Sequence, residues 1–589
     1  MSNKPKILFS KASFPSSGLD AFFKHRTLYL KPLHKAIIGI CLLAYSVAGV
    51  SQNNWHVATS GSDTSGDGSI NSPFATIQKA EQQVQPGDTV YVHQGTYRNS
   101  TFNDGDIWSG DNLLTITANG TPSNPIVFMP YPGDSVQLEF DDTYGIIIRN
   151  SSYVTVTGFE VKGIGDQIDQ TEADTAWGLY KDSSGIVHDL ATELGIDIND
   201  PSLSGTEVPK PSLPDISKPN YYNGRGIVAN DSHHITISNN IVRDVPSSAI
   251  RCQQSDYTTI AGNTVYNNTF WTTQGVGAIT VAEATPTPAG DTNNGIKIVL
   301  EKNYVHHNEN RLISWNPTKT FVKMVIDEGT GLFLTRNRDT YTYGSILIAN
   351  NISSFNGASG IVSHYTNRVI IEHNTVYKNG TTNDSAAGGI GINNVDDVII
   401  RNNISYAEPD HWALGTLALP NTNVSIYNNL LFNENGSETI YNNLAAGWFE
   451  SDPLFTDATN ADFSLTASSP AIDAGSTAGT QTDDFLGSPR NDSAPDIGAF
   501  EYSAALSTPE YEGYNISLFP NPTDQFAYIE LKGTFHAISC FDISGKEIFR
   551  IKNPANELQL DFSSLEKGLY ILKFTSSKNQ ITLKRLLLR

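Results

Sequence analysis

A short phrase of alternating apolar and polar residues returns along the middle of the chain. Each copy places Ile or Val at every second position, then Asn, then a further apolar pair, as in residues 235–242. Alternation with a period of two residues predicts a β-strand. The Asn near the end of each phrase stands at Asn240, Asn263, Asn303, Asn351, Asn374, Asn403 and Asn429, with spacings of 23, 40, 48, 23, 29 and 26 residues. These spacings indicate a repeat of about 23 residues that insertions or doubled units lengthen in places.

A repeat of this length fits one rung of a solenoid, with about three short strands and three turns. A single rung cannot bury its own apolar face, whereas stacked rungs bury a continuous core. The recurring Asn suits a turn, because Asn tolerates the left-handed conformation and its amide can bond the next rung. The pattern therefore predicts an all-β parallel β-helix (solenoid) over residues 52–502, in which these Asn residues are structural.

Composition and charge limit the partners of this body. Apolar residues make up 39% of the chain and 47 of its 589 residues are Gly, which favours a turn-rich β protein over a helical enzyme. The net charge is −23, yet residues 1–51 carry seven Lys or Arg and one Asp, and residues 515–589 carry ten Lys or Arg and seven Asp or Glu. The middle of the chain therefore carries −32. Such a body repels nucleic acid, and it binds a polyanionic sugar only through a local cationic groove or bound cations.

Both ends of the chain differ from the repeats. Lys31 and Lys35 precede the apolar run 36–45 and several small residues up to Ser51, which is typical of a signal peptide. We expect residues 1–51 to be a leader and signal peptide, and residues 503–514 to be a linker. In residues 515–589, period-two alternation such as that of residues 570–574 predicts a small β-sandwich.

The tail carries three short motifs: Pro-Asn-Pro at 520–522, Asp542 followed by Gly545-Lys546, and Gly568-Leu569-Tyr570 followed by Lys573. In this combination it resembles the C-terminal sorting domain of the type IX secretion system of Bacteroidetes. The resemblance implies export across the outer membrane with cleavage of the tail. It therefore implies a secreted or cell-surface protein with the type IX secretion machinery as a partner.

The repeat body has a recognisable beginning and end. Residues 56–63, 73–80 and 86–97 open it, and residues 469–475 and 495–501 close it. These segments resemble the pectate-lyase-like superfamily of right-handed parallel β-helices. The resemblance implies a right-handed solenoid with a capping helix near residues 75–84. It does not specify a reaction, because the superfamily contains lyases, hydrolases, epimerases and binding proteins.

The strand that opens each rung predicts the floor of a groove. If the apolar positions of each strand face the core, the alternate side chains face outward. This set is Val228, Asn230, Arg251, Gln253, Thr280, Phe333, Thr335, Val362, His364, Gly391 and Asn393. Stacked rungs lie about 4.8 Å apart, so these side chains should form one surface, although a register shift of one residue would replace the set. Long insertions at 163–222, 267–295 and 306–345 should shape this binding face.

Ionisable residues are densest between 306 and 339, and they supply the chemical candidates. A lyase on a uronate needs positive charge at the carboxylate, a base for the C5 proton and an acid for the leaving oxygen. We predict catalytic roles for Lys323, Arg336, His364 and Glu309, substrate-binding roles for Arg251, Trp315, Arg338 and Tyr365, and Ca²⁺ ligation by Asp327 and Glu328. Carboxylate oxygens are suitable Ca²⁺ ligands, and no organic cofactor is expected.

A glycoside hydrolase would instead need two carboxyls about 5–5.5 Å or about 6.5–9.5 Å apart. Asp327 and Glu328 suit this poorly as a pair, since neighbours on a strand point to opposite faces, whereas Glu309 with either of them is a plausible combination. Trp271, Trp315 and Tyr365 are either sugar-stacking platforms or covered hydrophobic edges. The pair His306-His307 lacks a metal-site spacing and favours a packed or exposed turn.

These observations predict a secreted, polysaccharide-active β-helix protein. A polysaccharide lyase acting on an acidic, uronate-containing glycan by β-elimination is slightly favoured over a glycoside hydrolase. A non-catalytic glycan-binding or adhesin solenoid is the third reading. The expected partner is an extracellular polysaccharide, with no nucleic acid, and the expected state is a monomer.

Overall fold

A computed structural model describes residues 52–502 and 516–588, with gaps at 288, 383–386, 436–439, 442–446, 480, 492–493, 520–522, 524, 543–545, 566 and 578–580. The expected signal peptide and linker, 1–51 and 503–514, lie outside the described residues. The chain divides into two compact units after Tyr502.

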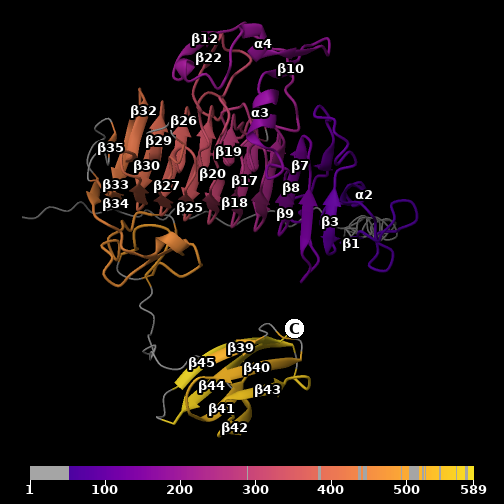
Figure 1. Cartoon of the computed structure of the whole chain (residues 1–589), viewed down its shortest axis with the longest axis vertical. Helices are drawn as coiled ribbons and strands as arrows, with labels where there is room; N and C mark the ends of the chain where they lie inside the picture. The colour runs from indigo at the N-terminus through magenta and orange to yellow at the C-terminus, as the bar shows by residue number, and fades with distance from the viewer. Residues whose placement is uncertain are drawn as a thin grey trace, which may run out of the picture. The chain divides into compact units, whose positions relative to one another are not determined.

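The first unit is a parallel β-helix whose rungs follow one another along a single axis (Figure 1). Within a rung the chain passes through sheet 1, sheet 2 and sheet 3, as in β13 to β15. Sheet 1 consists of β4 (Asn112–Ile116), β7 (Tyr144–Arg149), β13 (Arg225–Asn230), β16 (Ile250–Gln253), β19 (Ile279–Ala282), β23 (Leu332–Thr335), β26 (Ile361–His364), β29 (Ala387–Asn393), β32 (Trp412–Ala418) and β35 (Ile440–Tyr441).

Sheets 2 and 3 complete each rung, and most of their strands pair in parallel with the equivalent strand of the next rung. Sheet 2 consists of β1 (Asn54–Val57), β2 (Thr89–Val92), β5 (Ile126–Pro130), β8 (Ser152–Thr157), β14 (His233–Ser238), β17 (Asp256–Ala261), β20 (Ile296–Glu301), β24 (Ser345–Ala349), β27 (Val369–Glu372), β30 (Asp396–Arg401) and β33 (Thr422–Tyr427). Sheet 3 consists of β3 (Gly95–Arg98), β6 (Val136–Glu139), β9 (Glu160–Lys162), β15 (Ile241–Arg243), β18 (Thr264–Tyr266), β21 (Tyr304–His306), β25 (Ile352–Ser354), β28 (Thr375–Tyr377), β31 (Ile404–Ala407), β34 (Asn429–Asn433) and β36 (Trp448–Glu450).

The recurring Asn residues form the predicted ladder at the turn between sheets 2 and 3. Asn263 Nδ2 donates to Asn303 Oδ1 at 3.0 Å, and Asn303 Nδ2 donates to Asn351 Oδ1 at 2.9 Å. Each amide also bonds main-chain groups, so these fully buried side chains are satisfied. The structural reading of these residues is confirmed. A second ladder, which the sequence did not reveal to us, links Asn268, Asn308, Asn356 and Asn379 after sheet 3.

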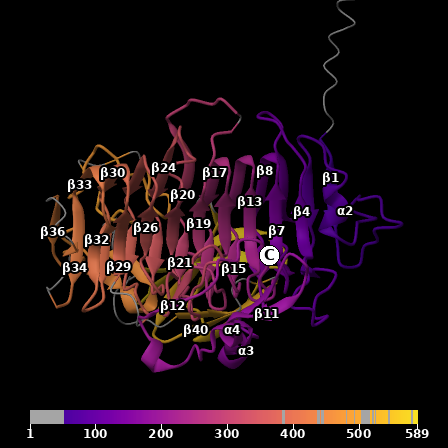
Figure 2. The same cartoon turned by 90° about the horizontal axis from the view of Figure 1, so that it is seen from above.

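Residues 163–224 leave the solenoid between β9 and β13 and form a small subdomain, which we call the insertion. It contains α3 (Gln170–Ala176), β10 (Leu179–Lys181), β11 (Val187–Asp189), α4 (Leu190–Leu194), a short 3₁₀ helix (Pro201–Leu203) and β12 (Glu207–Pro209). Strand β12 pairs with β22 (Phe321–Lys323) from a later turn. The insertion has its own apolar core and lies over one side of the stack (Figures 1 and 2). Helix α3 was not predicted from the sequence.

Both ends of the solenoid are covered. The predicted capping helix is α2 (Ile77–Glu81), whose N-cap Thr76 accepts a hydrogen bond from the Lys79 amide. At the other end, the chain after β36 forms the short hairpin β37 (Phe455–Asp457) and β38 (Asp462–Leu465). Phe463 of β38 packs against Tyr377 of sheet 3.

The second unit is a small antiparallel β-sandwich. One sheet consists of β39 (Ile516–Phe519), β40 (Phe526–Leu531) and β43 (Glu557–Asp561), and the other of β41 (Phe535–Phe541), β42 (Glu547–Lys552), β44 (Gly568–Ser576) and β45 (Ile581–Leu588). Their inner faces share one apolar core that includes Ile538, Leu572 and Phe574. The predicted all-β class, with a β-helix followed by a sandwich, is confirmed. Within the described residues, no helix has the length and apolar character needed to cross a membrane.

Candidate functional site

Two rows of side chains line the outer face of sheet 1. The strand register aligns Arg251, Thr280, Phe333, Val362 and Gly391 in one row, which we call the inner row. It aligns Gln253, Ala282, Thr335, His364 and Asn393 in a second, which we call the outer row. The alternate positions, such as Cys252 and Leu334, belong to the solenoid core. The predicted floor residues therefore face outward, and the register shift considered above does not occur.

Loops at the two edges of sheet 1 wall this floor. On one side, the turns from sheet 3 carry residues 267–278 and 307–331, and the insertion is packed on them. On the other side, the turns to sheet 2 carry Glu283 and Arg336, which follow β19 and β23 directly. These loops flank the outer face of sheet 1 across β13, β16, β19, β23 and β26, which is the face that the sequence predicted as a groove floor, and we refer to this flanked face as the groove.

Arg251 is the central cation of the floor. Its side chain is buried, and its Nε donates to Gln253 Oε1 at 3.0 Å. Burial, together with the neighbouring charges of Arg225 and Arg336, lowers the pKa of Arg251 to about 9. A lowered pKa in an arginine indicates a guanidinium that lacks sufficient compensating negative charge. An anionic group bound here would supply that charge.

Arg225 and Arg336 extend this positive region to both walls. Arg225 lies at the start of β13 and donates to Gln274 Oε1 at 3.1 Å. Arg336 is exposed and donates through Nε to Glu283 Oε1 at 2.8 Å. Among the described residues, Glu283 is the single carboxylate that forms an ion pair with any of these three arginines, so they make a cationic patch in a strongly acidic body.

Glu328 projects from the opposite wall. Burial and, to a lesser extent, the adjacent Asp327 raise the pKa of the Glu328 carboxyl to about 8, against the opposing effects of the Thr330 hydrogen bond and of Arg336. The Glu328 backbone has φ 93°, a conformation that costs free energy in a residue with a side chain and that concentrates at functional sites. Its side chain lies over Gly275, whose hydrogen faces the Glu328 methylene. At neutral pH Glu328 is therefore placed to act as a proton donor.

His364 supplies a base in the outer row, between Thr335 and Asn393. Its Nδ1 lies 2.9 Å from Thr335 Oγ1, and its ring is stacked on Phe333 with a centroid separation of 6.0 Å. Burial, and then Arg336, lower the pKa of His364, although Asp327 opposes the shift. The imidazole is thus neutral at pH 7 and able to accept a proton. The groove therefore holds a neutral base, a protonated acid and positive charge together.

Tyr365 and Arg338 lie next to this site but engage each other. The Arg338 guanidinium sits 4.8 Å from the Tyr365 ring centroid and also bonds Asn394 Oδ1. Glu309 accepts a hydrogen bond from Arg311 at 2.7 Å and packs over Gly357. Its side chain also accepts a hydrogen bond from Thr381 at 3.5 Å, and its predicted pairing with Asp327 or Glu328 stays a prediction.

Two of the predicted site residues belong to the insertion side of the wall. Lys323 ends β22, opposite Glu207, and its side chain points to solvent. Trp315 is 2% exposed, donates through Nε1 to the Trp177 carbonyl at 3.0 Å and is covered by Lys218. A sugar ring cannot stack on Trp315 in this arrangement, so the alternative of a covered hydrophobic edge applies. Trp271 is buried in the same core.

Asp327 and Glu328 are the predicted calcium ligands. Within the described part of the chain, no group of three or more His, Cys, Asp or Glu residues is arranged to hold a metal. Asp327 and Glu328 face Arg336, and the raised pKa of Glu328 makes it a weak ligand at neutral pH. His306 is stacked between Tyr266 and Tyr304, at 5.1 and 4.3 Å. Calcium stays a prediction, and no step proposed below passes through it.

Several groove residues escaped the sequence reasoning. Glu283, Arg225 and Gln274 reach the site from the ends of strands or from a loop, where no periodic pattern marks them. The sequence offered one signal for Glu283. This residue begins an insertion directly after a floor strand, and insertions at that edge of sheet 1 form a wall.

Three families match parts of the chain. Residues 55–202 match the family described as Pel9A-like, right handed beta helix region, and residues 136–380 match the right handed beta helix region. Residues 517–589 match the secretion system C-terminal sorting domain. Both resemblances seen in the sequence are confirmed, and the sorting domain assigns the protein to type IX secretion and to the cell surface or exterior.

Individual relatives and solved structures are also similar to this chain, at low overall identity or over a small part of its length. "Pectate lyase PEL9" of Emericella nidulans is 34% identical over 90 residues, which are 15% of this chain and 19% of that protein. The chain thus spans about a fifth of the length of this relative. Pectate lyase Pel9A has a TM-score of 0.42 at 16% identity, covering 77% of this chain and 98% of that one. A rhamnogalacturonan lyase has a TM-score of 0.36 at 13% identity, with 68% of this chain and 87% of that chain covered. A lacto-N-biosidase from Eubacterium ramulus has a TM-score of 0.33 at 12% identity, with 71% of this chain and 68% of that chain covered.

Proposed function

We propose that this secreted β-helix is a polysaccharide lyase that cleaves an acidic, uronate-containing glycan by β-elimination in the groove on sheet 1. The observation that carries the proposal is the cationic floor formed by Arg225, Arg251 and Arg336 within a body of charge −32. A buried, undercompensated guanidinium flanked by two further arginines in an acidic protein suits an anionic ligand. The matched pectate lyases support a glycan substrate.

The elimination needs three functions, and each has a candidate. Arg251 and Arg336 neutralise the uronate carboxylate, which makes the C5 hydrogen more acidic and stabilises the carbanion-like transition state. Neutral His364 removes the C5 proton, and the electron pair of that C–H bond forms the C4–C5 double bond. The C4–O glycosidic bond breaks, and protonated Glu328 gives its proton to the leaving oxygen. The products are an unsaturated uronide and a new free hydroxyl.

Absorbance near 235 nm tests this reaction, because the unsaturated uronide absorbs there. Purified protein is incubated with pectate, alginate and chondroitin, in Ca²⁺ and in chelator. We expect absorbance to rise with at least one glycan and to persist in chelator, since guanidinium groups supply the positive charge. A rise that requires Ca²⁺ would contradict the metal-free step and support the predicted Asp327 and Glu328 ligands.

Variants assign the roles. Arg251→Gln should reduce kcat/KM by about 100-fold or more, because removing a donor from a buried charge-stabilising site costs about 2.7–4 kcal/mol. Arg149→Gln is the matched control, since Arg149 is an exposed cation at the end of β7 on the same sheet. Lys323→Ala should leave the rate unchanged, and a loss of activity in that variant would return the role of base to Lys323.

A glycoside hydrolase is the second candidate, and one arrangement favours it. Glu328 and Glu283 project from opposite edges of sheet 1, the first with a raised pKa and the second ion-paired to Arg336. Glycoside hydrolysis uses such a pair, in which one carboxyl is protonated and acts as an acid while the other is ionised. New reducing ends without absorbance at 235 nm would support this reaction. Glycan binding without either signal would support the adhesin.

A further inference from the structure

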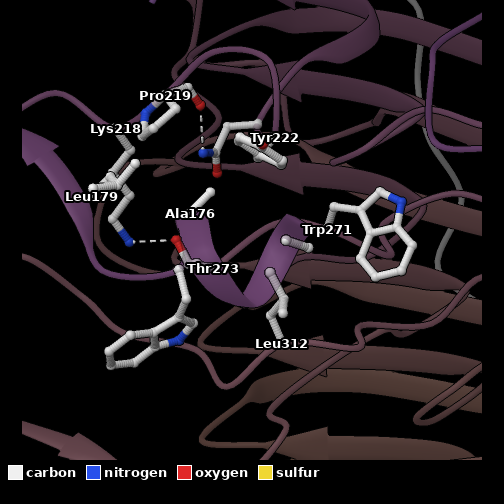
Figure 3. A pocket seen from close by; sticks show the side chains of 11 residues that line it. Ala176, Leu179, Lys218, Pro219, Tyr222, Trp271, Thr273 and Leu312 are labelled. Atoms are coloured by element: carbon white, nitrogen blue, oxygen red, sulfur yellow. Dashed lines mark hydrogen bonds between the residues drawn. The ribbon is translucent and has the colours of Figure 1, made fainter. Parts of the chain in front are cut away.

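Lys218 is a half-buried lysine whose ammonium lies at the junction of the insertion with the groove wall. It lies on the chain just before β13, and its Nζ donates to Thr273 Oγ1 (Figure 3) and to the Trp315 carbonyl, both at 2.8 Å. The Nζ also sits 3.5 Å from the Trp315 ring centroid. No carboxylate forms an ion pair with Lys218 in the described part of the chain. Its ammonium is therefore held by a hydroxyl, a carbonyl and an aromatic face.

These contacts tie three separate segments together. Lys218 belongs to the insertion, Thr273 to the loop 267–278, and Trp315 to the loop 307–331. The Trp315 amide donates to the Thr273 carbonyl at 2.9 Å, which closes the junction from the other side. The cavity beside them holds about 10 Å³, so Lys218 fills a nearly solid junction (Figure 3).

The residues after Thr273 contact the groove directly. Gln274 accepts from Arg225 at 3.1 Å through its side chain, and its carbonyl accepts from Asn310 Nδ2 at 3.3 Å. The same Asn310 amide bonds the Asp327 carbonyl at 3.3 Å. Gly275 then lies against Glu328. A displacement of this loop would move the acid and one floor cation together.

We propose that Lys218 is a positioning residue for the groove, which fixes the loop 271–277 so that Gln274 and Gly275 hold Arg225 and Glu328 in place. The inference rests on the proposed function and adds a residue that contacts neither substrate nor the reacting groups. An ammonium suits this place because it can donate to both the hydroxyl and the carbonyl while it faces the Trp315 ring.

Lys218→Met tests the proposal, since Met keeps the length of the side chain and loses the donors. Lys210→Met is the matched control. The Lys210 Nζ also lies near Trp315, at 5.8 Å from the ring centroid, but it bonds the carbonyls of Pro211, Pro317 and Lys319. Those acceptors lie beside the β12–β22 ribbon and not on the loop 271–277. Thr273→Val removes the same hydrogen bond from the other side and serves if Lys218→Met does not fold.

Hydrogen exchange and kinetics are measured on the same full-length samples. We expect faster amide exchange at 271–277 and about a ten-fold lower kcat with little change in KM in Lys218→Met, but neither in Lys210→Met. The double variant Lys218→Met, Gln274→Ala should lower kcat by a smaller factor than the product of the two single reductions, because both substitutions act through one loop. Unchanged exchange, unchanged kcat or fully multiplicative effects would each overturn the inference.

The proposed function and this inference fail in different ways. Absence of lyase and hydrolase activity in the natural protein would reject the function, while the exchange experiment would still show whether Lys218 holds the loop. Normal activity in a folded Lys218→Met variant would reject the positioning role and leave the function standing.

Discussion

Gly275→Ala is the sharpest perturbation of the groove that the structure offers. A Cβ added at Gly275 would lie 2.8 Å from Cγ of Glu328 and 3.5 Å from the Asp327 carbonyl oxygen. Ordinary Cβ contacts begin near 3.4 Å, so the Glu328 side chain must retreat by about 0.6 Å. The backbone of Gly275 is not among the left-handed glycines, so Ala fits its conformation without strain.

The expected cost falls on catalysis and not on stability. Misplacement of a catalytic group by 1 Å costs on the order of 100-fold in rate, so a shift of about 0.6 Å should lower kcat by roughly ten-fold. The atom that must move belongs to a side chain at the edge of an open groove, so the free energy of unfolding should change by less than about 1 kcal/mol. Because Glu328 is the acid in both candidate reactions, the prediction holds for a lyase and for a hydrolase.

Initial rates on the active glycan and thermal unfolding measure the two effects separately. Gly110→Ala is the control, because a Cβ at Gly110 meets no atom within 4 Å and its φ is also ordinary. If Gly275→Ala retains the natural kcat, Glu328 is not a positioned acid. If kcat falls only in proportion to a lower melting temperature, the substitution acts through stability and the reasoning fails.

Three further predictions concern pH and stability. The pH profile of kcat/KM should be bell-shaped. On the acid side kcat/KM should fall below the lowered pKa of His364, under 6.5, because protonation removes the base, and on the alkaline side it should fall above about pH 8, because Glu328 then loses its proton. A profile without the alkaline limb would exclude Glu328 as the acid. Asn303→Ala breaks a buried ladder and should lower the free energy of unfolding by about 2–4 kcal/mol in denaturant titrations, whereas a cost below 1 kcal/mol would mean that the rungs do not depend on the amides. Lys297→Met leaves Asp256 buried without its 2.6 Å partner and should lower the free energy of unfolding by about 3–5 kcal/mol. Lys302→Met, which breaks the half-exposed pair of Lys302 with Asp483, should lower it by about 0–1 kcal/mol. Equal losses in the two variants would contradict the argument from burial.

The solenoid could be read from the sequence because its signals are local and repeated. Alternation along each strand separates core from surface, and Asn240 to Asn429 mark one turn of each rung. The same alternation placed Arg251 and His364 on the outer face of sheet 1. The insertion lacks such a repeat, and α3 was missed because its apolar residues face a separate core.

The candidate site was predictable only in part, because proximity between loops leaves no periodic trace. Trp315 and Lys323 stand in the same charged stretch as Arg336, yet one is buried under Lys218 and the other points to solvent from β22. Arg336 meets Glu283, which is 53 residues earlier in the chain. The position of a residue within an insertion does not predict which wall of the groove its side chain will line.

The sequence by itself determined the all-β class, the rung length, the outward rows of the floor and the secretion tail, because each depends on residues within one repeat or one short motif. The tertiary structure decided which charges meet in the groove, which aromatic residues are covered and how the insertion is fastened. Those outcomes depend on burial and on contacts between loops from different rungs. Burial also sets the ionisation of Arg251, Glu328 and His364, because the cost of removing a charge from water is a property of the folded surroundings.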